Sequence, residues 1–343
     1  MTSKPAVGLP LDGVHLDLME SGRPTAPLHV VPLDGMDWDV VRAASATPPA
    51  HTGMPGPAPV LVGFATRPLP PQAAPFVEQL TVTLGGELAP FCAGDATHLD
   101  SVRATVAAAP SATLTLDAVL RTAARSTLAD GLLVESLAYS MLLGAPEFTT
   151  WRSRVPHREV TAGVEPVLLE RDGGVLRITL NRPRRHNAFG HAVRDGLLDA
   201  LELAYADTSV TEVVVSGAGP SFCSGGDLDE FGTTPDVATA HLLRLNRSAG
   251  RAVAALGDRV RFEVHGACIG AGIEVPSFAP RVTARSGAYF QLPELAMGLI
   301  PGAGGTVGLT RRIGRWRTAY LALTGRTIDV ATALEWGLVD ARA

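Results

Sequence analysis

The spacing of hydrophobic positions changes along the chain, and the change predicts a domain boundary near residues 156–162. After the boundary, short apolar runs alternate with longer segments in which apolar residues recur every three or four positions. The first pattern predicts buried strands, and the second predicts amphipathic helices. Two strands are predicted within 163–183, joined in a hairpin by Asp172-Gly173-Gly174. Further strands are predicted at 210–219, 259–270 and 281–286, and helices at 192–207 and 237–256. Strands that alternate with helices indicate an α/β layered fold.

The chain before this boundary changes its pattern once more. Apolar runs at 28–33 and 59–65 predict two buried strands around a loop rich in Pro and Gly at 46–59, and 71–84 predicts a helix. From residue 100 to 154 the pattern is helical. We therefore predict an α/β extension at 1–100, a helical subdomain at 101–160 and an α/β core at 161–343.

The composition indicates a globular protein with a sizeable core, because 46% of its 343 residues are hydrophobic and its net charge is −5. Nucleic-acid proteins usually carry a basic patch, so we expect no nucleic-acid partner. No apolar run approaches the roughly 18 residues of a membrane helix, so we expect no membrane partner. The cysteines Cys92, Cys223 and Cys268 lack close CxxC spacing, which, without a leader sequence, predicts reduced thiols in a cytoplasmic protein.

Two glycine-rich loops follow predicted strands of the core, at 216–231 and 264–280. Ligands of α/β proteins bind beyond the carboxyl ends of strands, and a glycine-rich turn before a helix leaves backbone N–H groups free. One N–H group from each loop can therefore converge on a carbonyl oxygen and stabilise an oxyanion. Tight backbone packing explains the same pattern equally well. Neither loop contains the GK[ST] of a P-loop or a dinucleotide fingerprint.

Two carboxylates stand beside apolar residues in this half of the chain. Glu274 lies in the second loop, and Glu294 lies farther along, in the segment 288–314. Burial disfavours the charged form of a carboxyl group and raises its pKa, which suits acid–base catalysis near neutral pH. On spacing alone, a structural role is the commoner outcome, in which both carboxylates accept backbone N–H groups.

Four motifs, in this order, resemble the crotonase (enoyl-CoA hydratase/isomerase) superfamily. "ITLNRPRRHNAF" resembles the strand and loop that contact coenzyme A, and "FCSGGDLDEF" resembles the first oxyanion loop. "HGACIGAGIE" resembles the second oxyanion loop, and "FQLPELAMGLIPGAGGT" resembles the second catalytic segment. The resemblance covers residues 165–343 and implies a core built as a spiral of ββα repeats.

The resemblance implies a role for each matching residue. The backbone N–H groups of Ser224 and Ala271 would bind a thioester oxygen, Glu274 would mainly position water, and Glu294 would mainly transfer a proton. The residues that would bind substrate are Arg184, His186, Ala188, Gly225, Gly226, Asp227 and Gly302. The resemblance implies no metal and no separate cofactor, because coenzyme A is part of the acyl-CoA substrate. It also implies a homo-oligomer, a trimer or a hexamer.

Three features depart from the superfamily. Ala271 replaces the middle glycine of a triplet, which keeps the N–H group and narrows the pocket. Pro276 follows Glu274 where the superfamily has a helix that ends in an aspartate. Residues 102–156 of this chain resemble the helices that usually follow the core in the superfamily. We therefore expect the helical subdomain to stand before the core in this chain. We also expect the strands of 28–65 to be remnants of a duplicated core. An unrelated N-terminal domain is the alternative.

The leading functional interpretation is an enoyl-CoA hydratase or isomerase. A second interpretation is another thioester-enolate reaction, namely thioester hydrolysis, decarboxylation or cofactor-independent oxygenation of an aryl-acetyl-CoA. A third is a non-catalytic partner subunit. The presence of both glutamates favours the hydratase, because lyase and oxygenase members of the superfamily often lack an acid at the position of Glu294.

Overall fold

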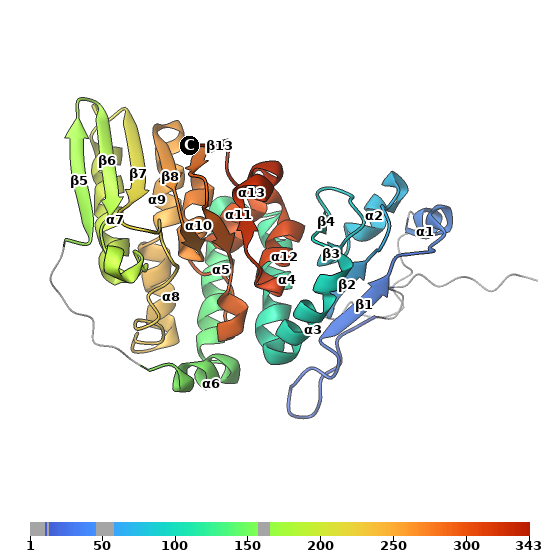
Figure 1. Ribbon diagram of the computed structural model, residues 1–343. Coiled ribbons are helices and arrows are strands. Elements are labelled where there is room, and N and C mark those ends of the chain that lie inside the picture. The colour runs from blue at the N-terminus through green and yellow to red at the C-terminus, as the bar shows by residue number, and fades with distance from the viewer. Residues whose placement is uncertain (1–10, 12–13, 46–57, 157–164) are drawn as a thin grey trace, which may run out of the picture.

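The computed structural model describes residues 11, 14–45, 58–156 and 165–343 (Figure 1). A small sheet near the N-terminus and a larger sheet of the C-terminal half lie at opposite ends of the molecule, with helices of both halves between them. The predicted boundary at 156–162 and most of the predicted loop at 46–59 lie outside the described residues. The division of the chain at residues 100 and 160 stays a prediction.

A six-stranded sheet forms one end of the molecule, in the order β13-β10-β8-β7-β6-β5. Its strands are β5 (Val167–Asp172), β6 (Val175–Leu180), β7 (Glu212–Gly217), β8 (Val260–Val264), β10 (Arg281–Ala284) and β13 (Ala341–Arg342). β5 and β6 pair antiparallel around Gly173, whose φ of 57° favours glycine, and the other neighbours pair in parallel. The predicted hairpin and α/β fold class are confirmed.

A second sheet of three short strands carries the loops of interest. Its order is β12-β11-β9, with β9 at Ala267–Ile269, β11 at Tyr289–Gln291 and β12 at Ile328–Asp329. β9 and β11 run parallel and pair Ile269 with Gln291. The chain therefore leaves both strands at the same edge of the sheet, which brings the loops that follow them together.

Seven helices belong to the C-terminal half: α7 (His191–Ala206), α8 (Val237–Asn246), α9 (Ala249–Leu256), α10 (Ala271–Glu274), α11 (Gly305–Ile313), α12 (Arg315–Thr324) and α13 (Val330–Trp336). The prediction of one helix over 237–256 was wrong, because the chain breaks between α8 and α9. Ser248 has an extended backbone there, and its hydroxyl accepts the N–H of Arg251 at 3.3 Å. This is the geometry of a helix N-cap, so a new helix begins after Ser248.

The N-terminal end is a parallel sheet in the order β1-β2-β3-β4. Its elements are β1 (Leu28–Pro32), α1 (Trp38–Ser45), β2 (Val60–Phe64), α2 (Ala74–Val77), β3 (Val82–Leu84) and β4 (Cys92–Ala93). The strands predicted at 28–33 and 59–65 are present as β1 and β2. The helix predicted over 71–84 was wrong, because α2 ends at Val77 and the β-branched Val82 and Thr83 pair with β2 in a buried strand.

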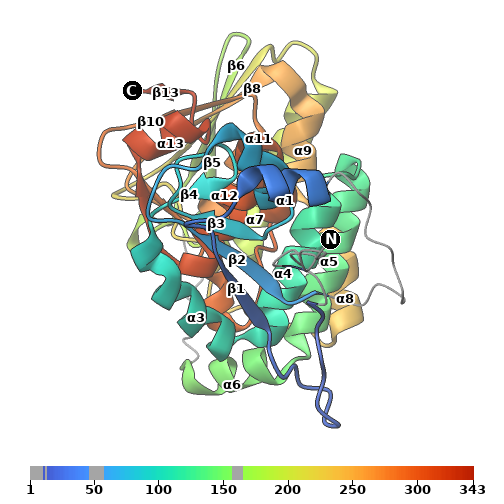
Figure 2. The ribbon, with the colours of Figure 1, turned by 90° about the vertical axis from the view of Figure 1, so that its right-hand side faces the viewer.

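Four helices connect the two ends: α3 (Leu99–Ala108), α4 (Pro110–Ala123), α5 (Leu128–Leu143) and α6 (Pro146–Arg154). α5 packs on α8, α4 on α11 and α3 on α12, and Figure 2 shows the N-terminal sheet in front of α4 and α12. Val62, Leu116 and Leu309 belong to one buried cluster, so the N-terminal sheet, α4 and α11 share a hydrophobic core. Among the described residues, no single helix has the length and apolar composition to cross a membrane. Only the bent pair of α5 and α6, taken together, has that length and composition.

Candidate active site

The three-stranded sheet β12-β11-β9 brings the carboxyl groups of Glu274 and Glu294 together. Glu274 ends α10 shortly after β9, and Glu294 begins a 3₁₀ turn, Glu294–Met297, after β11. The N–H of Gly270 donates to the carbonyl of Gln291 at 3.0 Å, which joins the two loops at their start. A Cβ on Gly270 would lie 2.5 Å from Oε1 of Glu294 and 3.7 Å from Oε1 of Glu274. Both carboxyl groups therefore face this glycine, whose φ of 50° also excludes most side chains.

Glu274 is held in place by the start of α11. Its Oε2 accepts the N–H groups of Ala303 at 2.8 Å and Gly305 at 2.9 Å. Burial raises the pKa of Glu274 well above its ordinary value, the charges of Glu294 and Glu135 raise it further, and the two N–H donors oppose the rise. Its Oε1 makes no hydrogen bond with any described residue, so this oxygen is free to bind water or a substrate.

Glu294 is buried, with 6% of its surface exposed, and its Oε2 has no hydrogen-bond partner among the described residues. Burial raises the pKa of Glu294 from 4.5 to about 8, and the charge of Glu135 adds to the rise. Both effects favour the protonated form of this side chain. A buried acid without a partner, close to a second acid, fits proton transfer to a bound ligand better than a purely structural role.

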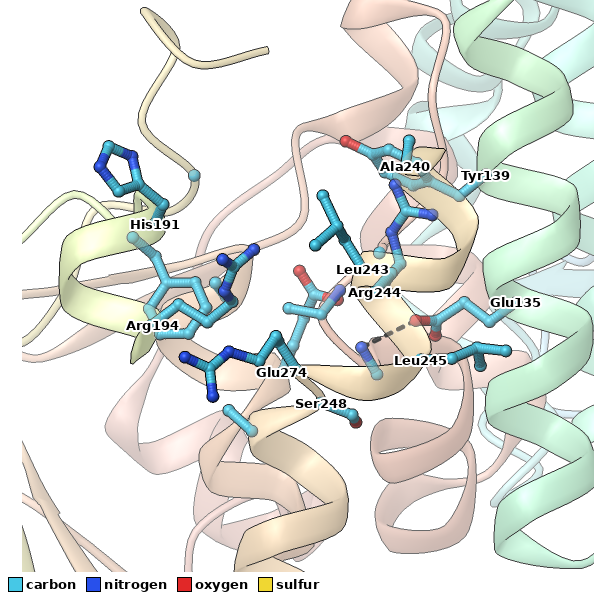
Figure 3. Close-up of a pocket in the computed structure, with 18 of the residues that line it drawn as sticks. Glu135, Tyr139, His191, Arg194, Ala240, Leu243, Arg244, Leu245, Ser248 and Glu274 are labelled. Carbon is cyan, nitrogen blue, oxygen red and sulfur yellow. Dashed lines mark hydrogen bonds between the residues drawn. The ribbon is translucent and has the colours of Figure 1, made fainter. Parts of the chain in front are cut away.

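Glu135 is a third carboxylate at the site, and the sequence patterns did not single it out. It comes from α5 and is buried, with 1% of its surface exposed. Oε1 accepts the N–H of Gly304 at 2.8 Å, the bond that a dashed line marks in Figure 3. Oε2 accepts the N–H of Thr306 at 2.9 Å and its hydroxyl at 2.6 Å. Burial raises the pKa of Glu135 to about 7. Its position inside the apolar run "GLLVESLAY" was the available signal, because a charge there needs partners.

Two cavity-lining residues of the glycine-rich loops have backbone N–H groups without a hydrogen bond among the described residues, and one of them differs from the prediction. Ser224 was predicted to supply an N–H group, but it donates to the carbonyl of His186 at 2.9 Å and does not line the cavity. That prediction was therefore wrong. The N–H groups of Gly226 and Ala271 make no hydrogen bond within the described part of the chain, and both residues line the cavity. Phe189 and Gly226 form an isolated parallel bridge. Its hydrogen bonds are made by the peptide groups on either side of the N–H of Gly226, so that N–H group stays free.

The loop after β6 contains Arg184, His186 and Ala188, for which the resemblance implied contacts with coenzyme A. Asn187 is completely buried, and its side-chain amide donates to three carbonyls of the loop after β7, those of Ala218, Ser221 and Phe222, at 2.9 to 3.0 Å. Of the predicted contacts, Arg184 and His186 are exposed and Ala188 is buried, and none of the three lines the cavity. Asn187 was not among the predicted residues, although it fixes the loop that carries them.

Asp227 joins this loop to the first oxyanion loop. Its buried carboxylate pairs with Arg182 at 3.0 Å and with Arg185 at 2.7 Å, and Arg185 also pairs with Asp229. Asp227 lines the cavity, but its carboxylate is already occupied by two guanidinium groups. Its ion pairs therefore hold two loops together, whereas the resemblance implied a substrate contact.

The carboxyl pair lies in the wall of a cavity of about 280 Å³ (Figure 3). Six predicted residues line it: Gly226, Asp227, Ala271, Glu274, Glu294 and Gly302. Five do not: Arg184, His186, Ala188, Ser224 and Gly225. The helical segment adds Leu132, Glu135 and Tyr139, and the ring of Tyr139 lies directly against Gly302, where a Cβ would collide with it. The N-terminal half of the chain thus forms part of the cavity wall.

The arrangement combines two acids of raised pKa with two free N–H donors in one cavity. Such donors stabilise negative charge on a carbonyl oxygen, and the acids exchange protons with a bound molecule near neutral pH. Within residues 14–45, 58–156 and 165–343, no cluster of three His, Cys, Asp or Glu side chains has the arrangement of a metal site. The cysteines of this region are inert, because burial raises the pKa of Cys223 to about 12 and that of Cys268 still further.

Comparison with known proteins identifies relatives of the C-terminal half. Residues 170–342 match the family described as enoyl-CoA hydratase/isomerase. The 2,3-dehydroadipyl-CoA hydratase of Escherichia coli K12 is 35% identical over 51% of this chain and 68% of its own length. A probable enoyl-CoA hydratase of Mycobacterium tuberculosis is 34% identical over 51% and 68%. The 1,2-epoxyphenylacetyl-CoA isomerase of E. coli K12 is 34% identical over 51% and 69%.

Two solved structures are similar over the same half. The enoyl-CoA hydratase from Mycobacterium smegmatis is 30% identical, covers 52% of this chain and 70% of that chain, and has a TM-score of 0.49. The enoyl-CoA hydratase from Thermoplasma volcanium GSS1 is 29% identical, covers 52% and 72%, and has a TM-score of 0.48.

Proposed function

The chain belongs to the enoyl-CoA hydratase/isomerase family, and from that premise we propose that it adds water to an enoyl-CoA thioester by means of Glu274, Glu294 and two backbone N–H groups. The match over residues 170–342 confirms the resemblance drawn from the four motifs. Relatives named as hydratases and as an isomerase support this class of enzyme. The observation that carries the proposed mechanism is the pair of buried carboxyl groups that face Gly270 inside the cavity.

The oxyanion hole of this proposal consists of the N–H groups of Gly226 and Ala271. Both are free, both belong to cavity-lining residues, and they come from the two glycine-rich loops. A thioester oxygen between them gains negative charge when the Cα=Cβ bond is attacked, and the two donors stabilise that charge. Loss of one such donor raises the barrier by about 2.7–4 kcal/mol in well-studied hydrolases.

The carboxyl pair supplies the proton transfers. Two acids that face one glycine resist double ionisation, so the pair holds one proton between its members over a wide range of pH. Glu274, as the carboxylate, accepts a proton from water while the water oxygen forms a bond to Cβ. The C=C electron pair moves to Cα and onto the thioester oxygen, and Glu294, as the acid, delivers its proton to Cα. The balance is one water added and no electrons transferred, so the proposed reaction requires no metal and no redox cofactor.

An isomerase is the second candidate. One relative is named an isomerase, and the same pair of acids can remove a proton from one carbon of an enoyl chain and return it to another. Product analysis separates the two, because hydration gives a hydroxyacyl-CoA and isomerisation gives an enoyl-CoA of unchanged mass.

The test is turnover of enoyl-CoA substrates by the purified chain. We expect wild type to remove the conjugated thioester absorbance of crotonyl-CoA or longer enoyl-CoAs, and Glu274→Gln and Glu294→Gln each to lose at least about a hundredfold in kcat. Glu170→Gln is the matched control, because Glu170 is an exposed carboxylate of β5 and should not affect kcat. Turnover of an aryl-acetyl-CoA with oxygen but of no enoyl-CoA would favour the oxygenase alternative, and no turnover of any acyl-CoA would favour a non-catalytic subunit.

Assembly and location remain part of the proposal. We propose a cytoplasmic homo-oligomer, trimer or hexamer, with acyl-CoA as its small-molecule partner and with neither nucleic acid nor membrane. α5 presents an exposed apolar row of Leu133, Leu137 and Met141, which suits a contact with another copy. Light scattering of the purified chain tests the assembly, and a monomer at micromolar concentration would contradict it.

A further inference from the structure

Arg244 is a largely enclosed cation of the cavity without a carboxylate partner. It lies on α8, and its guanidinium carbon sits 4.1 Å from the ring centroid of Tyr139 (Figure 3). One nitrogen, Nη1, donates to Oγ of Ser140 at 3.0 Å and to the carbonyl of Ser136 at 3.3 Å. Nε and Nη2 make no hydrogen bond with any described residue, and no described carboxylate forms an ion pair with this side chain. The N–H groups of Nε and Nη2 are therefore available to donate to a ligand.

The other cations of the cavity wall differ from Arg244. Arg194 pairs with Asp195 at 2.9 Å, and Arg247 pairs with the same carboxylate at 3.3 Å. Arg251 is exposed to solvent at the rim. In Figure 3, Arg194 lies on one side of the cavity and Arg244 lies with Tyr139 on the other. Arg244 is therefore the cavity cation, among the described residues, that is both sheltered from water and without an anionic partner.

A sheltered guanidinium without an anion is an unfavourable arrangement for a folded protein. Burial lowers the pKa of Arg244, and the nearby negative charges offset only part of that effect. Glu135, the carboxylate on the facing helix, does not satisfy Arg244, because both its oxygens bind the start of α11. A guanidinium presents five N–H donors in a planar fork that matches a carboxylate, so a ligand carboxylate would complete this site.

We propose that Arg244 binds a carboxylate at the far end of the acyl group, so that the substrate is the mono-CoA thioester of an unsaturated dicarboxylic acid. This inference rests on the proposed function, because it names the substrate class of the same cavity. Glu274 and Glu294 act on the thioester end, and Arg244 with Tyr139 forms the wall that receives the other end. Arg244 is thus a specificity-determining residue with no part in the proton transfers.

The test compares two substrates that differ only at that end. One is an α,β-unsaturated dicarboxylic acid joined to CoA through one carboxyl group, and the other is its terminal methyl ester. We expect wild type to prefer the acid by about ten- to a hundredfold in kcat/KM, the range for a hydrogen-bonded charged pair. We expect Arg244→Met to abolish this preference with little change for the ester, and Arg244→Lys to restore part of it.

The control and the contrary outcomes are distinct. Arg285→Met carries the same change of charge on an exposed side chain that does not line the cavity, and it should leave the ratio between acid and ester unchanged. Equal turnover of both substrates by wild type overturns the inference and leaves the proposed function intact. Turnover of crotonyl-CoA with no turnover of either substrate has the same meaning, whereas no turnover of any enoyl-CoA contradicts the proposed function itself. If Arg244→Met does not fold, the inhibition constants of the saturated acid and ester thioesters on wild type decide the question, because equal constants also overturn it.

Discussion

Glu135 and Glu274 accept alternate N–H groups of one helix start, although they come from opposite halves of the chain. Glu274 accepts from Ala303 and Gly305, and Glu135 accepts from the two positions that alternate with them. Four consecutive N–H groups at the N-terminus of α11 are thus shared between two carboxylates. Helix α5 therefore contributes to the geometry of the carboxyl pair and does more than cover it.

Replacing Glu135 by Gln tests this contribution. The amide group would put an N–H donor against the donors of Gly304 or Thr306, so we expect a loss of about 2 kcal/mol in the free energy of unfolding. We also expect kcat on enoyl-CoA to fall, because the start of α11 also holds Glu274. Urea denaturation and initial rates measure the two effects.

Glu147→Gln is the matched control for this change. Glu147 accepts the N–H groups of Ser111 at 2.9 Å and Ala112 at 3.3 Å at the start of α4, and it does not line the cavity. Its replacement should reduce stability without affecting kcat. An unchanged kcat in Glu135→Gln as well would show that Glu135 acts on stability alone.

Gly270→Ala should inactivate the site without unfolding the protein. The added Cβ would lie 2.5 Å from Oε1 of Glu294 and would displace that carboxyl group. The backbone of Gly270, with a φ of 50° and a ψ of −121°, lies in a region that L residues rarely adopt, so a side chain here also reduces stability, whatever the space around it.

Gly173→Ala separates these two effects. Gly173 has a φ of 57° in the β5–β6 turn, and a Cβ there would meet no atom within 4 Å. We expect a loss of thermal stability in both variants and a loss of turnover only in Gly270→Ala. Equal activity of the two variants would contradict the proposed position of Glu294.

The stability of the protein should fall as pH rises, because of Glu294. Its pKa is raised from 4.5 to about 8 in the folded protein, so between these values the unfolded chain has released the proton and the folded protein retains it. The stabilisation is therefore complete below pH 4.5 and is lost as pH rises through about 8. Glu294→Gln stays neutral and should show a flatter dependence of melting temperature on pH. Parallel curves for wild type and variant would indicate that Glu294 has an ordinary pKa.

Asp227→Asn should loosen the loop between β6 and α7. The change removes the buried carboxylate of Arg182 and leaves Arg185 only Asp229, and breaking a buried ion pair costs about 3–5 kcal/mol. Asp207→Asn removes the surface pair with Arg171 and should cost much less, because that pair is solvated. Chemical denaturation compares the two variants, and similar losses would argue against a special role for the Asp227 pairs.

The predictions that succeeded depend on local features of the chain. The alternation of apolar residues predicted the β5–β6 hairpin, and the motifs singled out Glu274, Glu294 and Ala271. Each feature lies within a few residues and reflects the period of a strand or the chemistry of one loop. The predictions that failed involve competition between partners. Ser224 has the right place in its motif, but its N–H group is bound to His186 and that of Gly226 is free.

The sequence by itself determined which residue types carry the chemistry and that strands and helices alternate around them. Only the tertiary structure decided which N–H groups stay free, that Glu135 joins the two catalytic candidates, and that Arg244 lacks an anionic partner. The physical reason is that hydrogen bonds and ion pairs between distant segments depend on how α5 and α8 pack against the core. Side-chain burial, and with it the raised pKa of each glutamate, follows from that packing and leaves no periodic signal along the chain.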